Sequence, residues 1–190
     1  MKKIKKLKLH NFRKFKNLEI DFDDDLNLLI GDNEAGKSSI LTAIDLVLSG
    51  SRTKVENIGL ENLFNKDIIR EFLSSKRNNN YLPKLFLELY LDEQNNDRTS
   101  GRNNSDNVEC DGLRLNIFPN DEYSKYIKEI LENPDCVFPF EFYTISFTTF
   151  SDISYNSFAK HLKHIFIDNS SMNNEYAMKE YVKDIYNSSL

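Results

Sequence analysis

The chain has 190 residues, of which 39% are hydrophobic and 12% aromatic, so it can bury a sizeable core and lies at the upper edge of one domain. No stretch approaches about 18 uninterrupted apolar residues and the N-terminal segment lacks an apolar signal-peptide centre, so we expect a soluble, cytoplasmic protein without a membrane partner. Cys110 and Cys136 stand far apart without a Cys-x-x-Cys spacing, which argues against a zinc site or a disulfide framework.

The formal charge of −5 conceals a strongly basic N-terminal segment. Residues 1–16 contain eight Lys or Arg and no acid, so the other residues sum to −13 (−5 minus +8). One interpretation is that lysines on an edge strand discourage edge-to-edge aggregation. The other is that these residues face the phosphates of a nucleotide or a nucleic-acid backbone. The eight basic residues are Lys2, Lys3, Lys5, Lys6, Lys8, Arg13, Lys14 and Lys16.

Three strand patterns occupy the first thirty residues. Apolar residues recur through residues 4–12, and in residues 17–22 they alternate with polar ones, as in a half-buried strand. The acidic residues 23–25 would form a turn, and the apolar run 26–30 is typical of a buried strand. These three strands would lead into one helix.

That helix should begin at about Gly36, because apolar residues then recur at helical spacing. The Ser-Gly-Ser sequence at residues 49–51 should end it. The predicted apolar face consists of Ile40, Leu41, Ile44, Val47 and Leu48.

The segment between the third strand and the helix matches the P-loop pattern Gly-x-x-x-x-Gly-Lys-Ser. Its glycines allow close backbone approach, so that successive N–H groups can point at phosphate oxygens, and the helix N-terminus adds its dipole. Lys37 can reach the β- and γ-phosphates of a nucleotide, and the Ser38 hydroxyl can ligate a Mg²⁺ ion that bridges them. The alternative is a glycine-rich turn without a ligand. The predicted nucleotide-binding residues are Gly31, Asp32, Asn33, Glu34, Ala35, Gly36, Lys37, Ser38 and Ser39.

The opening sequence resembles the N-terminal lobe of the RecF, SMC and OLD (overcoming lysogenisation defect) group of ABC-type ATPases. Members of this group open with a strand, an Asn-Phe-Arg turn, a second strand and Gly-x-Asn-x-x-Gly-Lys-Ser at a helix start. Residues 11–13 and Asn33 reproduce both features, and the match covers residues 1–50. Glu34 and Ala35 replace the Gly that SMC proteins usually have within the loop, which favours the OLD-like branch.

The resemblance implies an α/β fold, with a mixed sheet around the P-loop helix, an antiparallel hairpin and flanking helices. It implies ATP with Mg²⁺ as ligands and a contact from Arg13 to a phosphate or to the adenine edge, since a guanidinium can bind phosphate bidentately. The alternative for Arg13 is an exposed turn residue. In this group ATP lies between two heads, so a second ATPase head is an expected partner, and DNA is the expected partner of the full assembly.

Residues 84–93 imitate a Walker B motif, with Asp92 in the place of the magnesium-binding acid and Glu93 in the place of the base. A Walker B strand is central and parallel, hence apolar on both faces, whereas Glu88 interrupts this pattern. The polar residues 93–107 follow, and then a second apolar segment. We therefore predict an antiparallel hairpin with a polar tip in place of a Walker B strand.

Other candidate site residues are weaker. Asp168 is followed by Asn169 where the catalytic Glu of a Walker B motif would stand, so a sheet strand or the start of a terminal helix is favoured. His161 and His164 lack a third metal ligand, and a solvated basic face is expected. Gln94, the only glutamine, falls in the polar tip and is no convincing match to the magnesium-binding glutamine of the group.

Three further elements are predicted in the second half of the chain. Residues 120–134 should form a helix, residues 138–150 a strand and residues 174–190 a helix. The predicted apolar face of the first of these helices is Tyr123, Tyr126, Ile127, Ile130 and Leu131.

We assign residues 1–190 to a single ATP-binding lobe, an incomplete part of a larger ATPase. Residues 1–50 would hold the strands, the P-loop and its helix. Residues 51–150 would hold helices and antiparallel strands with the polar tip 93–107, and residues 151–190 would begin a helical arm.

The favoured function is the ATP·Mg²⁺-binding lobe of an OLD-like or RecF-like ATPase that acts on DNA in antiphage defence or DNA repair. In the resembling proteins the signature motif, Walker B and, in OLD proteins, a Toprim nuclease domain follow, and we expect little ATP turnover from this chain alone. The first alternative is a self-contained small P-loop NTPase or kinase that uses Asp92 or Asp168. The second is a non-enzymatic interaction module.

Overall fold

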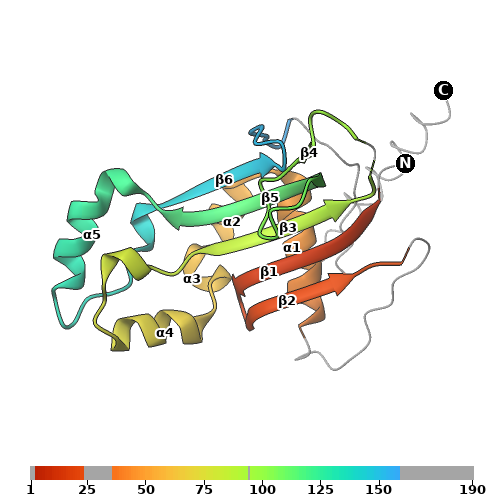
Figure 1. Ribbon diagram of the computed structural model, residues 1–190. Helices are drawn as coiled ribbons and strands as arrows, with labels where there is room; N and C mark the ends of the chain where they lie inside the picture. The colour runs from red at the N-terminus through yellow and green to blue at the C-terminus, as the bar shows by residue number, and fades with distance from the viewer. Residues whose placement is uncertain (1–2, 24–35, 94, 159–190) are drawn as a thin grey trace. The chain divides into compact units, whose positions relative to one another are not determined.

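In a computed structural model of the chain, residues 3–23, 36–93 and 95–158 are described. They form a mixed α/β fold in which helices cover one side of a sheet (Figure 1). Within these ranges, none of the helices combines the length and the hydrophobicity that a membrane-spanning helix requires. In chain order the elements are β1 (Ile4–Phe12), β2 (Phe15–Asp21), α1 (Lys37–Ser49), α2 (Arg52–Ile58), α3 (Leu60–Leu63), α4 (Lys66–Ser74), η2 (Asn79–Tyr81), β3 (Leu85–Leu91), β4 (Ser100–Gly101), β5 (Cys110–Pro119), η3 (Asp121–Tyr123), α5 (Ser124–Leu131), η4 (Phe140–Phe142) and β6 (Tyr143–Thr149).

The described strands form one sheet in the order β2-β1-β3-β5-β4, and β6 also pairs with β5. Each of these pairings is antiparallel. The predicted α/β class and the antiparallel hairpin of β3 and β5 are therefore confirmed. The apolar run 26–30, residues 163–169 around Asp168 and the predicted helix 174–190 lie outside the described residues.

One face of the sheet is a continuous apolar surface. The register places Leu9 opposite Leu87 and Leu87 opposite Leu115, so leucines from three strands lie side by side. Helix α1 packs on β3 and β5 from this side, behind the sheet in Figure 1. Burying each such side chain stabilises the fold by about 1.5–3 kcal/mol. The strand residues of this face that are at most 2% exposed are Leu7, Leu9, Leu85, Leu87, Leu89, Leu113, Leu115 and Ile117.

The predicted apolar face of α1 is correct for Ile40, Val47 and Leu48, which are buried. It is wrong for Leu41, which is 44% exposed. Leu46 is fully buried instead, because the face that packs on the sheet is rotated toward residues that the apolar spacing alone did not select.

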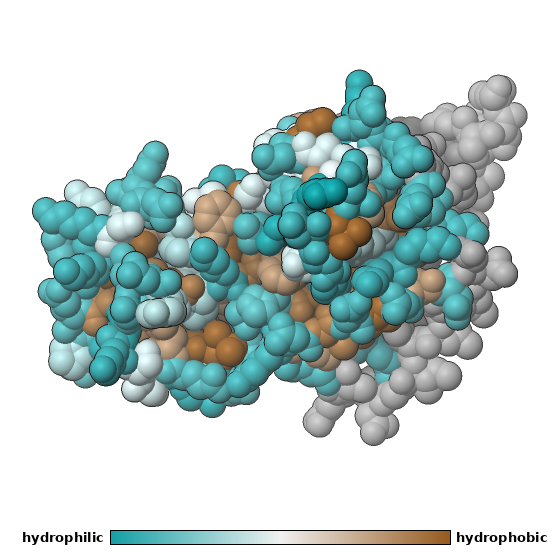
Figure 2. All heavy atoms as spheres, viewed as in Figure 1, coloured by the Kyte–Doolittle hydropathy of each residue, from teal (hydrophilic) through white to brown (hydrophobic). Residues whose placement is uncertain are grey.

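The opposite face of the sheet carries a row of alternating charges. The pairing register aligns Glu19 of β2 with Lys8 of β1, Lys8 with Glu88 of β3, and Glu88 with Arg114 of β5. The Lys8 Nζ atom lies 3.6 Å from Glu19 Oε2, and Arg114 Nε lies 3.4 Å from Glu88 Oε1. Opposite charges directly across neighbouring strands stabilise a sheet. Figure 2 shows that hydrophilic residues dominate this side of the molecule.

The polar tip between β3 and β5 folds back over this charged row. Ser105 donates two hydrogen bonds to Glu88, from its backbone N–H (2.8 Å) and from its hydroxyl (2.7 Å). Asp106 pairs with Lys8 and accepts a hydrogen bond from the Tyr90 hydroxyl at 2.9 Å. The hydrogen bond from Lys8 holds the pKa of Asp106 below its usual range, while burial raises the pKa of Tyr90 well above its ordinary value.

Glu88 is therefore buried, at 0% exposure, and β3 is buried on both faces. The prediction that residues 84–93 form an antiparallel hairpin arm is confirmed. Glu88, which was expected to mark this strand as different from a buried Walker B strand, is nevertheless buried in the sheet centre. The carboxylate is tolerated in the sheet centre because Ser105 and Arg114 supply its partners.

The predicted helix at residues 120–134 is present as η3 followed by α5. Ile127 and Leu131 are buried as predicted, whereas Tyr123 and Tyr126 are 41% and 57% exposed, so their assignment to the buried face was wrong. Arg77 donates to the carbonyls of Leu73, Asn133 and Pro134, and so ties the ends of α4 and α5 together. The strand predicted over 138–150 is shorter, because η4 occupies its first part.

A Glu88→Ala substitution should lower the free energy of unfolding by about 3 kcal/mol, because it leaves the largely buried Arg114 without its carboxylate and Ser105 without its acceptor. Urea denaturation followed by circular dichroism measures this loss. Glu109→Ala is the matched control, since Glu109 is exposed and lies 3.6 Å from Arg102, and it should change stability by less than about 0.5 kcal/mol. Equal losses in the two variants would contradict the structural role of Glu88.

Candidate functional site

Helix α1 begins at the end of the P-loop sequence. Gly36 is its N-cap residue, with φ 91°, and Lys37, Ser38 and Ser39 form the first turn. Among the described residues, no side chain caps this N-terminus, and its first turn contains no acid. The N–H groups at a helix start carry positive partial charge, and here no described carboxylate of the first turn offsets it. Residues 31–35, which include the predicted binding residues Gly31, Asp32, Asn33, Glu34 and Ala35, lie outside the described residues.

Gly36 is required sterically as well as by its backbone angle. A Cβ atom at this position would lie 2.5 Å from Lys14 Cε and 2.5 Å from Phe15 Cζ. Lys14 belongs to the turn between β1 and β2, and Phe15 is the first residue of β2, so this turn and the start of β2 lie directly against the start of α1. The absence of a side chain at residue 36 is what allows the close approach.

Arg13 lies in the same turn and reaches the first turns of α1. Its Nη1 atom donates toward Ser39 Oγ and Thr42 Oγ1, both at 3.4 Å. The guanidinium is half-buried, and burial lowers the pKa of Arg13 below its ordinary value. The structure therefore brings Arg13 together with the P-loop helix, which is inconsistent with the alternative of an exposed turn arginine. Thr42, whose hydroxyl also donates to the Ser38 carbonyl at 2.6 Å, was not singled out from the sequence.

The backbone around Arg13 is held from several elements. Asn11 and Arg13 both have left-handed backbone angles, with φ 54° and φ 49°. The Arg13 N–H donates to the Leu63 carbonyl at 2.7 Å, and the Asn65 N–H donates to the Asn11 carbonyl at 2.8 Å. The Asn11 side chain donates to the Lys84 carbonyl at 2.8 Å. Sequence reasoning recognised Asn11 as part of a motif but did not assign it this anchoring contact.

The structure removes Asp92 as a Walker B candidate. Its carboxylate accepts a hydrogen bond from the Lys3 N–H at 2.9 Å, and its own N–H donates to the Lys3 carbonyl at 3.0 Å. Asp92 thus continues the antiparallel pairing of β1 with β3 and does not end a parallel strand. Asp168, His161, His164 and Gln94 lie outside the described residues. Within the described ranges, no group of three or more His, Cys, Asp or Glu side chains could hold a metal ion.

The basic N-terminal residues are largely used within the fold. β1 pairs with β2 on one side and β3 on the other, so the interpretation of its lysines as edge-strand protection was wrong. Lys6 pairs with Glu19 at 2.7 Å, and Lys16 pairs with Glu71 at 2.7 Å. The hydrogen bond with Glu19 raises the pKa of Lys6 and correspondingly lowers that of Glu19.

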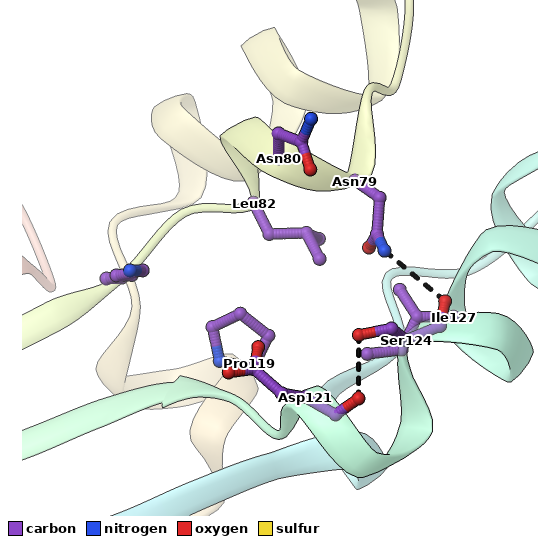
Figure 3. Close-up of a pocket in the computed structure, with 8 residues that line it drawn as sticks. Asn79, Asn80, Leu82, Pro119, Asp121, Ser124 and Ile127 are labelled. Carbon is purple, nitrogen blue, oxygen red and sulfur yellow. Dashed lines mark hydrogen bonds between the residues drawn. The ribbon is translucent and has the colours of Figure 1, made fainter.

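A polar cavity lies between η2, the end of β5 and α5 (Figure 3). It has a volume of about 220 Å³, and the Leu82 side chain points toward it. The Asn79 side chain donates to the Ser124 carbonyl at 3.3 Å, while its buried Oδ1 atom has no hydrogen-bond partner within the described part of the chain. The described residues of the P-loop and the first turn of α1, 36–39, do not line this cavity.

Comparison with known proteins gives the family directly. The AAA domain family matches residues 6–187, which is nearly the whole chain. The chain belongs to the AAA domain family. This agrees with the prediction of a P-loop ATPase lobe in the RecF and SMC group, while the finer OLD-like assignment stays a prediction.

Three curated relatives of this AAA domain are informative. The DNA replication and repair protein RecF of Oenococcus oeni is 47% identical over 51 residues, which are 27% of this chain and 13% of the relative. The DNA double-strand break repair Rad50 ATPase of Methanococcus maripaludis is 30% identical over 138 residues, 71% of this chain and 12% of the relative. RecF of Francisella tularensis subsp. novicida is 34% identical over 99 residues, 45% of this chain and 28% of the relative.

The AAA domain chain thus spans only a small part of these relatives, between 12% and 28% of their length. A solved structure from a study of ATP-driven dimerization and DNA-stimulated activation of SMC ATPases aligns with a TM-score of 0.40 and 19% identity. That alignment covers 76% of this chain and 67% of the other. At this TM-score and identity, the alignment does not establish any property of this chain.

Gly36→Ala should destabilise the fold by at least about 1–2 kcal/mol, because alanine disfavours a positive φ and its Cβ would clash with Lys14 and Phe15. Thermal unfolding followed by circular dichroism measures the change. Ser38→Ala is the control, since Ser38 lies two residues after Gly36 and its side chain is exposed. This substitution should change the stability by less than about 0.5 kcal/mol. Unchanged stability of Gly36→Ala would mean that the turn does not pack against α1 as described.

Proposed function

We propose that this chain is the ATP·Mg²⁺-binding lobe of a RecF/Rad50/SMC-type ATPase that acts on DNA. The observation that carries the proposal is the start of α1. A P-loop sequence ends there at a helix N-terminus that, among the described residues, has no side-chain cap and no acid in its first turn. Lys14 and Phe15 lie so close to residue 36 that only glycine fits there. Such a helix start binds phosphate groups through its N–H groups and its dipole.

Each residue of the site has a defined role in this proposal. The backbone N–H groups of residues 31–37 would hold the phosphates, and the Lys37 ammonium would neutralise the β- and γ-phosphates. The Ser38 hydroxyl would ligate Mg²⁺, which supplies charge neutralisation between the phosphates when it is bound. Arg13 is already partly desolvated beside Ser39, so it can bind a phosphate oxygen or the nucleotide edge at little further desolvation cost.

Hydrolysis would require groups from elsewhere in the assembly. Asp92 is engaged with the Lys3 backbone, so the described residues supply no carboxylate in the position of a Walker B acid. We propose that a signature motif and a Walker B strand come from a second ATPase head, either another copy or a further part of the same protein. In this arrangement ATP binding and head association are coupled.

The biological role proposed is DNA repair, because the relatives are a DNA replication and repair protein and a DNA double-strand break repair ATPase. The OLD-like branch, with antiphage defence and a Toprim nuclease in the complete protein, is the finer version of this proposal and rests on Glu34 and Ala35 within the loop. No observation favours a self-contained kinase or a non-enzymatic module over the ATPase lobe.

Lys37→Ala should weaken ATP·Mg²⁺ binding by about ten- to a hundredfold, and Arg13→Ala by about tenfold, because each removes a charge-assisted contact to phosphate. Isothermal titration calorimetry measures both. Lys66→Ala and Arg70→Ala are matched controls, since Lys66 and Arg70 are exposed on α4, and both should bind like the unaltered chain. Unaltered affinity of Lys37→Ala would place the nucleotide site elsewhere. Rapid ATP turnover by the unaltered chain alone, lost in Lys37→Ala, would contradict the need for outside residues.

DNA binding by this chain alone should be weak and strongly salt-dependent, because Lys6, Lys8 and Lys16 already pair with acids of the fold. Fluorescence anisotropy with a labelled duplex at about 50 mM and about 200 mM salt tests this. Tight binding that persists at the higher salt concentration would show a dedicated DNA surface and contradict the expectation.

A further inference from the structure

His10 precedes the Asn-Phe-Arg turn and is held by two side-chain amides. Its Nδ1 atom lies 2.7 Å from Asn17 Oδ1, and its Nε2 atom lies 3.0 Å from Asn11 Nδ2. The ring also stacks on Phe86, with 5.0 Å between the ring centroids and 16° between their planes. The imidazole is thus fixed in both position and orientation.

The orientation of the Asn11 amide determines the protonation of this ring. Its Nδ2 group donates to the Lys84 carbonyl at 2.8 Å, and turning the amide over would bring two acceptor oxygens together there. Nδ2 therefore donates one hydrogen to Lys84 and the other to His10 Nε2. Nε2 must be an acceptor, and Nδ1 carries the hydrogen that is donated to Asn17 Oδ1. These contacts fit the Nδ1–H tautomer of His10.

Protonation of Nε2 would turn this acceptor into a donor that faces another donor. Asn11 could then keep its bond to Lys84 or adapt to His10, but not both. Asn11 already has a left-handed φ of 54°, and its carbonyl accepts from the Asn65 N–H. Arg13 has a left-handed φ of 49°, and such a conformation at an arginine persists only when surrounding contacts hold it, so weakening one of them loosens the turn.

The turn in question carries Arg13. The chain of contacts runs from His10 through Asn11 to Arg13, whose Nη1 lies 3.4 Å from Ser39 Oγ on the first turn of α1. Lys14 follows in the same turn and Phe15 begins β2, and both side chains lie against Gly36. A change at His10 is therefore passed to the N-terminus of α1 by covalent and hydrogen-bonded neighbours only.

The charged groups around His10 do not compete with this contact. On the same face of the sheet they pair among themselves, in the alternating row of Glu19, Lys8, Glu88 and Arg114. Arg114 also lies over the Phe86 ring, 5.2 Å from its centroid, and Lys16 of β2 pairs with Glu71. In the described part of the chain, the hydrogen-bond partners of His10 are two amides, and none is a carboxylate.

We propose that His10 is a positioning residue of the nucleotide site: in its neutral form it holds Asn11, and thereby Arg13, in place beside α1, and its protonation weakens nucleotide binding. The proposal rests on the proposed ATP site. Histidine is the side chain whose ordinary charge change lies between about pH 5 and pH 8, and this range sets the two pH values of the test. An added positive charge by itself would strengthen the binding of an anionic nucleotide, so weaker binding on protonation is the signature of a displaced turn.

ATP·Mg²⁺ affinity should be measured by titration calorimetry at about pH 8 and about pH 5.5 for the unaltered chain and for His10→Gln. A glutamine oxygen can accept from Asn11 where Nε2 does, but it does not titrate. The protonation of ATP and its binding of Mg²⁺ also change with pH, but these changes affect the two proteins equally. Relative to His10→Gln, the unaltered chain should lose about fivefold in affinity at the lower pH, the factor that one hydrogen bond of ordinary strength gives.

A nitrogen NMR titration of the unaltered chain without nucleotide supplies the second measurement and needs no variant. The His10 ring should show the neutral Nδ1–H form at about pH 8, and the Arg13 and Asn65 amide signals should shift as it titrates. Equal pH dependence of ATP affinity in the two proteins would overturn the proposal. So would Arg13 and Asn65 amide signals that do not shift when the His10 signals shift. Absence of ATP binding at both pH values would instead refute the proposed nucleotide site, while the NMR result would still report whether His10 holds the turn.

Discussion

The antiparallel register of β1 against β3 is the constraint on which the other features depend. It places Leu9 opposite Leu87 and Lys8 opposite Glu88, so apolar and charged side chains separate onto the two faces of the sheet. A slip of one residue would exchange these faces and remove the surface on which α1 packs. The same register brings the end of β1 beside the start of β3, where the Asn11 side chain reaches the Lys84 carbonyl. The pairing register of β1 with β3 therefore determines both the apolar core and the contact that anchors the turn next to α1.

The charged face explains how a segment without apolar side chains becomes ordered. The tip supplies hydrogen bonds to Glu88, and Asn104 uses its side chain as a backbone would, accepting from the Val108 N–H at 3.2 Å and donating to the Val108 carbonyl at 2.7 Å. Thr99 and Asn104 are buried at 0% and 7% exposure. Order here comes from satisfied polar groups in a low-dielectric setting, where each bond is strong and each missing partner is costly. Electrostatics thus holds one side of the sheet and apolar packing the other.

The parts of the fold that could be predicted from the sequence depend on short-range signals. Alternation revealed β1 and β2, and Gly36 marked the start of α1 because a left-handed N-cap selects glycine locally. The errors came from pairing between distant residues. The burial of Glu88 could not be foreseen because its partner Ser105 lies 17 residues away in a segment that looks unstructured. One interpretation placed the lysines of β1 on an edge strand, because the pairing of β1 with β3 comes from far along the chain. The P-loop could be read from its spacing, whereas the anchoring of Asn11, 73 residues from Lys84, could not.

The Asn-Phe-Arg turn combines a motif that can be read from the sequence with contacts to distant residues that only the structure shows. A left-handed backbone suits asparagine, whose short side chain tolerates it, but it costs about 1–3 kcal/mol at an ordinary residue such as Arg13. Glycine would adopt φ 49° at lower cost, so the conformation alone gives no reason for an arginine. The Leu63 carbonyl holds the backbone of residue 13 whatever its side chain is, because the bond comes from the N–H. What only the arginine side chain adds is a guanidinium at the first turn of α1, partly stripped of water and held within reach of Ser39 and Thr42. The strained backbone therefore keeps a positive charge beside the end of the helix at which we propose that phosphate binds.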